Sequence, residues 1–327
     1  MRILAFITPF FLGLFTISTE AQIGADGTGT ITNQAGQVYE IKPGINLQNA
    51  NLYGLDLSGA NLADCNLNRA DLQNSNLTEA NLSGADLSYA KLNGAIMRNA
   101  DISFAIFRNG TLQNVDFTEA KSAGANFDYV NLSSSNFTSA NLNTATLKGV
   151  DANQVNFSNA NLSNAKCRGD FTFSNFTGAN LSSATFYEYV VGVNTISNLS
   201  GSILINTNLR FANLRESKIL AANLTGADLY GAFLKDADFS DSTLTGSKFL
   251  RADITGTTFE GAIRGPILNG RSDNLTLSVN TLTQQTTISL QLEQSDNLKS
   301  WQPIGDPVTQ VLDVPDGKNF LRFNLSK

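Results

Sequence analysis

The side chains with the clearest potential for chemistry are three closely spaced carboxylates, Asp236, Asp238 and Asp241. Paired carboxylates can perform acid–base chemistry on glycosides, and clustered ones can bind calcium. The 327-residue chain contains no histidine, which excludes Ser-His-Asp or Cys-His catalysis and histidine-bound zinc. No calcium-loop spacing surrounds the three aspartates. Their role therefore depends on the elements that carry them.

Those elements follow a five-residue repeat. From Leu47 to Cys167 every fifth residue is Leu, Ile, Met or Phe, with Ser122, Ala152 and Cys167 as the exceptions. A small residue, most often Ala, lies two positions earlier, and Asn or Asp commonly lies between them. A period of five fits neither a helix nor a strand. A chain that turns by about 90° at each unit would form square coils that bury these residues and stack about 4.8 Å apart.

The units Ala60–Asp64, Ala80–Gly84 and Ala222–Gly226 resemble the pentapeptide-repeat family. The resemblance implies an all-β fold, a right-handed quadrilateral parallel β-helix of about eleven coils over residues 45–265. We expect a core ladder that includes Leu62, Leu82, Phe107, Phe127, Leu224 and Phe239. Phe107, Phe117, Phe127, Phe137 and Phe157 are separated by tens, which places them on two opposite walls of the core.

The register of the repeat shifts twice. After Cys167 it slips by one to Phe171 and continues every fifth residue through Val191 and Ile196. It slips again to Leu204 and then runs unbroken to Phe259. The irregular segment 187–203 is a candidate interaction loop, because loops on a rigid scaffold often carry binding. Its candidate residues are Tyr187, Tyr189, Val190 and Val193; the simpler interpretation is a neutral insertion whose aromatic side chains pack on the wall.

The repeat register favours structural roles for the reactive side chains. It places Asp236, Asp238 and Asp241 at outward positions with no cleft, and it stacks Asp71 under Lys91 and Asp101 under Lys121. We therefore predict no catalytic, cofactor-binding or metal-binding residues. Cys65 and Cys167 lie about five coils apart, too far for a disulfide, so both are expected to be free and buried. The tripeptide Arg168-Gly169-Asp170 has the composition of an integrin motif, which arises often by chance.

The segments outside the repeats indicate export and capping. Residues 1–21 have the pattern of a secretory signal peptide, and no other apolar stretch is long enough to span a membrane. Residues 22–44 are expected to be a flexible segment followed by an N-terminal cap strand at Val38–Ile41. Residues 266–327 contain four candidate strands (275–279, 287–292, 308–314 and 320–323) and resemble small C-terminal antiparallel β-modules of exported bacterial proteins, with Trp301 in the core.

The expected function is that of a non-catalytic exported scaffold or protein-interaction protein, located in the periplasm, at the cell surface or in the medium. Its partner would be a protein or a cell-envelope component, and no cofactor is expected. The net charge of −6 is spread thinly, which argues against nucleic-acid binding. Two alternatives remain: a DNA mimic that inhibits a DNA-binding enzyme such as gyrase, as some family members do, and a carbohydrate-active or carbohydrate-binding β-helix. The sequence specifies neither the partner nor the oligomeric state.

Overall fold

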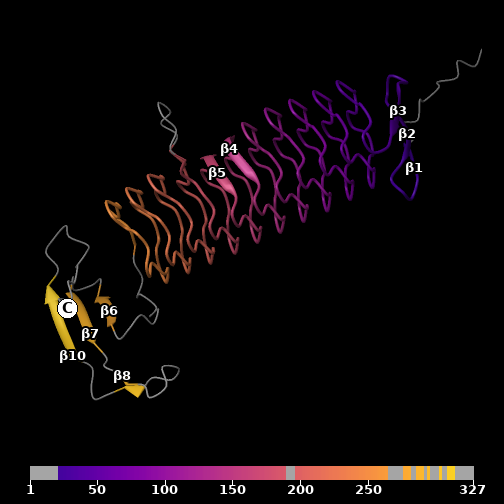
Figure 1. The fold of residues 1–327 in the computed structure, drawn as a ribbon. Helices are drawn as coiled ribbons and strands as arrows, with labels where there is room; N and C mark the ends of the chain where they lie inside the picture. Colours follow the sequence, from indigo (N-terminus) through magenta and orange to yellow (C-terminus); the bar gives the residue numbers. More distant parts are fainter. Residues whose placement is uncertain are drawn as a thin grey trace, which may run out of the picture.

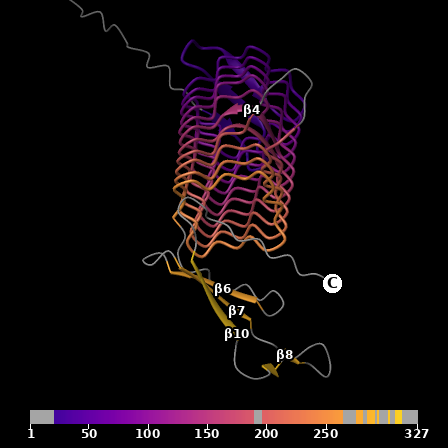
Figure 2. The same cartoon turned by 90° about the vertical axis from the view of Figure 1, so that its left-hand side faces the viewer.

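The computed structural model describes residues 21–188 and 196–263, and beyond these the backbone of five short strands between residues 275 and 313. From Asn46 to Ile263 the described chain forms stacked four-sided coils that build a rod (Figures 1 and 2). Parallel bridges join residues 20 positions apart, from the Asn46–Asn66 bridge to the Thr243–Ile263 bridge. Four five-residue units predict this spacing, so the expected parallel β-helix is confirmed. The described residues contain no helix, and hence no helical segment that could cross a membrane.

The backbone N–H groups of each five-residue unit form the same pattern of hydrogen bonds. The N–H of Leu47 donates to the carbonyl of Asn66 in the next coil (2.8 Å), and the N–H of Asn49 donates to Asn68 (2.9 Å). The N–H of Asn66 donates back to the preceding coil, and the N–H of Ala50 closes a turn on the carbonyl of Leu47 (3.0 Å). Four of the five N–H groups are therefore paired within the backbone. Proline lacks this donor, which explains its absence between residues 44 and 265.

The fifth N–H explains why Asn or Asp precedes so many core residues. In the unit around Leu82, the side-chain oxygen of Asn81 accepts the N–H of Ser83, two residues on (3.1 Å). Asp101 does the same for Ser103 (3.0 Å). Asx side chains are suited to this local bond because they are short. The Asn/Asp position therefore satisfies the turn as well as facing solvent.

The core is filled by columns of side chains that stack from coil to coil. Phe107 stacks on Phe127 (ring centroids 4.9 Å apart) and Phe117 stacks on Phe137 (4.4 Å). Phe107 also meets Phe117 edge to face across the core, at 6.3 Å. These contacts confirm that the phenylalanines occupy two opposite walls. The six residues expected to form the core ladder are all fully buried: Leu62, Leu82, Phe107, Phe127, Leu224 and Phe239.

Coil length changes around two parallel strands, β4 (Thr146–Asp151) and β5 (Lys166–Asp170). Asn156 bridges to Asn175, one residue short of the usual spacing, as the first register slip predicts. The next coil is longer, because Thr185 bridges to Asn213, 28 residues on.

The longer coil shows that the core positions predicted for residues 196–203 were wrong. Ile196 is 38% exposed and does not occupy a core position. The core resumes at the fully buried Leu199, one unit earlier than Leu204. Val191, also expected in the core, lies outside the described residues. The hydroxyl of Ser197 donates to the carbonyl of Phe186 and joins the two ends of the extra segment. Ser197 thus lies beside Phe186, and the core register restarts at Leu199.

The N-terminal edge of the rod is covered by a three-stranded antiparallel sheet of β1 (Ala21–Ile23), β2 (Gly29–Thr32) and β3 (Val38–Ile41). β3 occupies the residues for which a cap strand was expected. Residues 21–32 differ from the expected flexible segment, because they form a hairpin that pairs with β3. Ile31 and Ile41 are buried against the core, and the carbonyl of Gly27 accepts the N–H of Asn61 (2.7 Å). This burial orders a segment whose Gly- and Thr-rich composition gives little sign of structure.

Beyond the rod, β6 (Leu275–Asn280), β7 (Gln285–Leu290) and β10 (Val308–Asp313) form an antiparallel sheet in the order β10-β7-β6. A second antiparallel pair joins β8 (Glu293–Gln294) and β9 (Gln302–Pro303). The three strands of the first sheet correspond to three of the four expected from the sequence. The fourth, at 320–323, and Trp301 lie outside the described residues.

Candidate functional site

The three candidate carboxylates are dispersed by the coil geometry. Asp236 and Asp241 occupy turn positions with positive φ (60° and 58°) on neighbouring corners of the rod, and Asp238 lies on the wall between them. The carboxylate of Asp238 accepts hydrogen bonds from the N–H (3.0 Å) and hydroxyl (2.6 Å) of Ser240. Within the described residues no group of His, Cys, Asp or Glu could hold a metal ion. Asp238 thus supports a turn.

The two thiols are also part of the scaffold. Cys65 and Cys167 are free and buried. Burial raises the pKa of both thiols above the usual value. The thiol of Cys65 contacts the carbonyl of Lys42 (3.2 Å). The thiolate, which is the nucleophile, is therefore disfavoured at both positions.

One side of the rod has a distinct composition. We call it the Ile106 face: the wall whose outward residues stack in the order Asp86, Ile106, Asn126, Thr146, Lys166, Thr185, Asn213 and Phe233, together with its two flanking corners. Exposed aromatic residues lie on these corners, including Tyr89 (52% exposed), Phe104 (69%) and Tyr129 (50%). Aromatic residues, Met and Arg are enriched in the cores of protein interfaces.

Arginine side chains stack on the aromatic rings of this face. Arg69 lies 5.6 Å from the ring centroid of Tyr89, and Arg108 lies 5.5 Å from that of Tyr129. Further along, Arg210 lies 4.3 Å from the ring of Tyr230. The remaining contacts join Arg210 to Phe211, Arg215 to Phe233 and Arg251 to Tyr230. All the arginine–aromatic contacts of the described residues thus belong to the Ile106 face.

Glycine makes room for several of these rings. Phe104 lies against Gly124, Tyr129 against Gly149 and Phe211 against Gly231, each in the next coil at the same turn position. A Cβ atom on any of these glycines would come within 2.7 Å of the ring. Each ring therefore lies against the backbone of the following coil, where a larger residue than glycine would collide with it.

An ion-pair cluster lies on a corner of the Ile106 face, at Glu188 in the longer coil. Glu188 pairs with Lys148 (2.9 Å) and Arg168 (3.4 Å). The hydrogen bond from Lys148, together with the charges of Lys148, Arg168 and Lys166, holds the pKa of Glu188 below its usual value. Arg168, the first residue of the Arg-Gly-Asp tripeptide, is only 9% exposed. This tripeptide is thus part of β5 and its arginine is committed to Glu188.

Of the four candidate loop residues, the structure describes Tyr187. Tyr187 is half-buried beside Glu188, on a corner of the Ile106 face. Tyr189, Val190 and Val193 lie outside the described residues. The sequence therefore located the irregular coil, but the described part of it contributes an ion-pair cluster that the loop hypothesis did not include.

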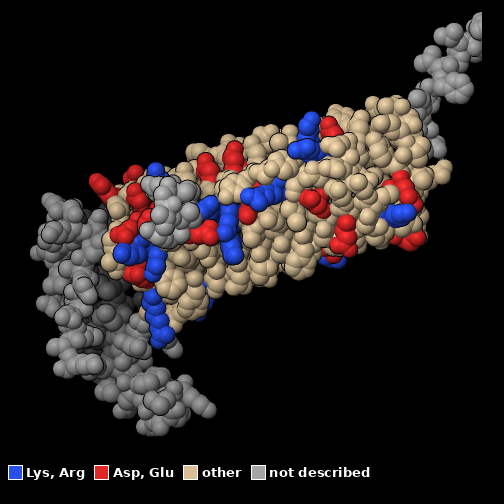
Figure 3. Space-filling view, turned by 45° about the horizontal axis from the view of Figure 1, so that its top comes forward, with Lys and Arg blue, Asp and Glu red and all other residues tan. Residues whose placement is uncertain are grey.

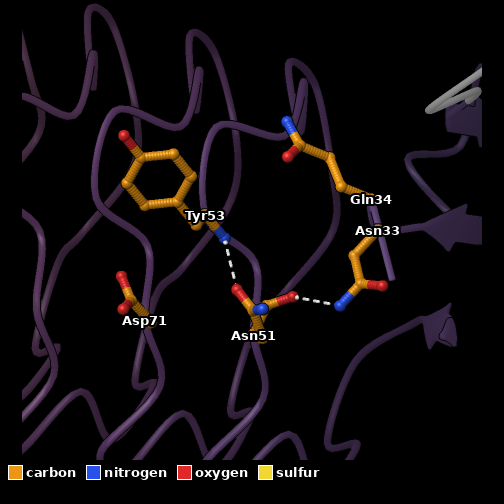
Figure 4. A pocket seen from close by; sticks show the side chains of 5 residues that line it. All are labelled: Asn33, Gln34, Asn51, Tyr53 and Asp71. Carbon is orange, nitrogen blue, oxygen red and sulfur yellow. Dashed lines mark hydrogen bonds between the residues drawn. The ribbon is translucent and has the colours of Figure 1, made fainter. Parts of the chain in front are cut away.

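A shallow polar hollow of about 210 Å³ lies on a different wall, beside the N-terminal sheet (Figure 4). Its lining residues are Asn33, Gln34, Asn51, Tyr53 and Asp71. The side chain of Asn33 donates to the carbonyl of Asn51 (3.1 Å), and Asn51 accepts the N–H of Tyr53 (3.3 Å). These bonds connect the sheet to the first coil, so the hollow lies at the contact between the N-terminal sheet and the rod.

Basic and acidic groups are interspersed along the rod. Asp71 bridges to Lys91 and Asp101 to Lys121, as the repeat register predicts. On the face shown in Figure 3, Lys and Arg side chains lie beside Asp and Glu side chains. This arrangement differs from the continuous basic stripe of a nucleic-acid-binding surface.

The square coils and their filled core match a known family. A family model described as "Pentapeptide repeats" matches in eight copies that cover residues 45–169 and 197–261. The chain belongs to the pentapeptide-repeat family. The match confirms the resemblance read from the five-residue units and assigns the handedness of the β-helix, which is right-handed in this family.

Solved structures similar to this pentapeptide-repeat chain come from several sources. HetL, a pentapeptide-repeat protein involved in heterocyst differentiation regulation in the cyanobacterium Nostoc sp. strain PCC 7120, is 29% identical over 68% of this chain and 90% of its own, with a TM-score of 0.25. Rfr23 from the cyanobacterium Cyanothece 51142 is 27% identical over 29% of this chain and 60% of its own (TM-score 0.27). Full-length QnrB1, a plasmid-mediated fluoroquinolone resistance protein, is 20% identical over 68% of this chain and 90% of its own (TM-score 0.32). No curated protein matches the chain.

The Ile106 face of this pentapeptide-repeat protein was not found from sequence. Its arginine and aromatic residues are one coil apart in space but about 20 residues apart in the chain, as Arg69 and Tyr89 are. A search of each turn position at intervals of 20 residues would have found them. The same search would have found the paired Phe104 and Gly124.

Proposed function

We propose that this protein is a non-catalytic exported scaffold that binds another protein through the outer surface of its rod. The observation that carries the proposal is the filled core. Its large side chains, such as Phe107, Phe117 and Phe137, are fully buried and stack in contact with one another. A rod filled in this way offers its outside for recognition, and the Ile106 face has the composition of an interface.

The carboxylates support a structural role. Asp116 and Asp253 have lowered pKa values, and both accept hydrogen bonds from the threonine two residues on. In Asp116, burial opposes this effect, and the bonds from Thr118 and the Arg98 ion pair (2.6 Å) outweigh it. Groups held ionised in this way stabilise turns and neighbouring coils. A general acid would need the opposite shift.

Export is the second part of the proposal. Residues 1–21 have the pattern of a signal peptide. Gln22 and Ile23, which would follow the cleavage site, pair with Thr30 and Gly29 of β2. Cleavage after Ala21 would therefore leave most of β1 in place. The partner would then be a secreted protein or a protein of the cell envelope.

Three measurements test the proposal. Intact-mass analysis of the protein purified from its native host should show a chain that begins near Gln22, and fractionation should place it outside the cytoplasm. A chain that retains residues 1–21 in the cytoplasm would contradict export and would favour mimicry of DNA. Incubation of the protein with a panel of polysaccharides should release no sugars. If the wild type releases sugars and Asp238→Asn does not, the non-catalytic assignment is contradicted.

The binding part needs a separate experiment. The exported protein should capture a specific partner when it is used as bait in the native envelope or secreted fraction. The same bait without residues 266–327 should retain that partner, because the proposed surface lies on the rod. Loss of the partner on truncation would assign binding to the C-terminal strands instead.

A further inference from the structure

One cluster of exposed apolar side chains lies on the N-terminal half of the Ile106 face. Phe104 and Ile106 belong to one coil, and Tyr89 and Tyr129 to the coils on either side. All four side chains are exposed, Phe104 to 69% and Ile106 to 38%. We define the aromatic–arginine patch as these four residues and the two arginines stacked on the tyrosines: Arg69, Tyr89, Phe104, Ile106, Arg108 and Tyr129.

The two arginines of the patch have free hydrogen-bonding capacity. Neither Arg69 nor Arg108 has a carboxylate within 4 Å among the described residues. By contrast, Arg98, on another corner, pairs with Asp116 at 2.6 Å. Asp86 and Asp128 lie beside the patch, and one oxygen of each accepts a backbone N–H, from Ser88 and Lys148 respectively (both 2.9 Å). Each guanidinium group therefore lies over a tyrosine ring and has no carboxylate partner in the described part of the chain.

The packing of the rings restricts what could bind there. One side of the Tyr129 ring lies on Gly149 and Arg108 lies over it. Phe104 likewise lies on Gly124. A sugar stacks on an open ring face, and Arg69 and Arg108 lie over the two tyrosines, whereas Phe104 remains 69% exposed. A nucleic acid needs a continuous positive stripe, and Asp86 and Asp128 interrupt it here.

The ligand that best complements the arginines and apolar side chains of the patch is a protein segment with both acidic and apolar side chains. Arginine pairs well with carboxylates because its planar fork donates two parallel hydrogen bonds. Arg69 and Arg108 lie two coils apart, about 10 Å along the rod at the usual strand spacing. We propose that the aromatic–arginine patch binds an acidic peptide segment of a partner protein, whose carboxylates pair with Arg69 and Arg108 and whose apolar side chains cover Phe104 and Ile106. This inference rests on the proposed scaffold function and names the chemistry of its partner.

A displayed library of random peptides of about twelve residues provides a defined probe. Selection on the full chain should enrich sequences that combine two or more Asp or Glu residues with apolar ones. A synthetic peptide from that selection should bind Arg69→Gln/Arg108→Gln about tenfold or more weakly, and its affinity should fall with rising salt. Lys91→Gln/Lys121→Gln removes the same charge from other walls and should leave the affinity within about twofold.

A second variant tests the apolar half of the patch. Phe104→Ser should weaken the same peptide about fivefold or more, whereas Ile96→Ser, on the opposite wall, should not. Circular dichroism and thermal unfolding identify any variant that fails to fold.

Three results would overturn the proposal. These are selected peptides without acidic residues, equal loss in the Lys91→Gln/Lys121→Gln control, and binding of heparin that depends on Arg69 and Arg108 while no peptide is selected. A partner captured from the envelope that still binds Arg69→Gln/Arg108→Gln would refute the patch while the scaffold function stands. Absence of any captured partner would bear on the scaffold function itself.

Discussion

The ring of Phe104 lies on the backbone of Gly124, one coil further along the rod. A Cβ atom on Gly124 would come within 2.6 Å of the ring, and the φ of Gly124 is 67°. Bulky and glycine residues are therefore matched across coils at the turn position. The match explains how a surface so rich in aromatic residues can stack at a spacing of about 4.8 Å.

The first prediction concerns this match. Gly124→Ala should destabilise the protein by about 2–3 kcal/mol, because alanine must adopt a left-handed conformation and displace the ring. Gly54→Ala is the control, because Gly54 has a φ of 65° and no neighbour within 4 Å of the added Cβ; it should cost about 1 kcal/mol. Chemical denaturation measures both. The additional Phe104→Ala substitution should recover part of the Gly124→Ala loss, and strict additivity would contradict the contact.

The second prediction concerns the absence of proline. Ile219→Pro should prevent or strongly impair folding, because the N–H of Ile219 donates to the carbonyl of Asp238 (2.7 Å) and its loss costs about 3 kcal/mol or more in a regular element. Leu220→Pro should be tolerated, because the next N–H lies at the free position of the turn. Thermal unfolding of the pair checks this. An equal loss of thermal stability in both variants would show that the turn conformation itself does not accommodate proline.

The third prediction concerns acid stability. The folded pKa of Glu188 is lowered from its usual 4.5, first by the hydrogen bond from Lys148 and then by nearby positive charges. A lowered carboxyl pKa contributes stability that is present above the unfolded value and is lost as pH falls through the folded value. Thermal stability should therefore fall more steeply below about pH 4.5 in the wild type than in Glu188→Gln or Lys148→Met. Superimposed curves between pH 6 and pH 3 would contradict it.

The fourth prediction concerns the thiols. Burial raises the pKa of Cys65 and Cys167, so neither should react with a disulfide reagent in the folded protein at neutral pH. Both should react once the chain is unfolded in denaturant. Cys65→Ser, studied in parallel, assigns any residual reactivity. A Cys65–Cys167 disulfide in the non-reduced protein would contradict the fold.

The repeat could be predicted in detail because the residue types within each five-residue unit indicate its conformation. Leu62 and Leu82 mark the buried positions, and Asn61 and Asn81 indicate the turns that follow them. The register after Phe186 could not be predicted, because Ile196 suits a core position as well as Leu199 does. Only the closure of the coil by Ser197 decides between them.

The N-terminal hairpin was missed for a different reason. Ile31 is buried only because the first coil offers it an open edge, and residues 22–35 carry little periodic signal of their own. The Ile106 face was missed because stacking pairs residues 20 apart, as with Arg108 and Tyr129 nearly one coil away.

The pairing of bulky residues with glycines one coil on gives each coil a fixed neighbour. If residues 111–130 were deleted, a whole turn of the β-helix would be removed and the five-residue pattern would remain intact. Phe104 would then meet Thr144 in place of Gly124. The rod is thus an ordered series whose members are not interchangeable. Duplication or loss of a coil would place Phe104, and rings packed like it, against new turn residues at the junction.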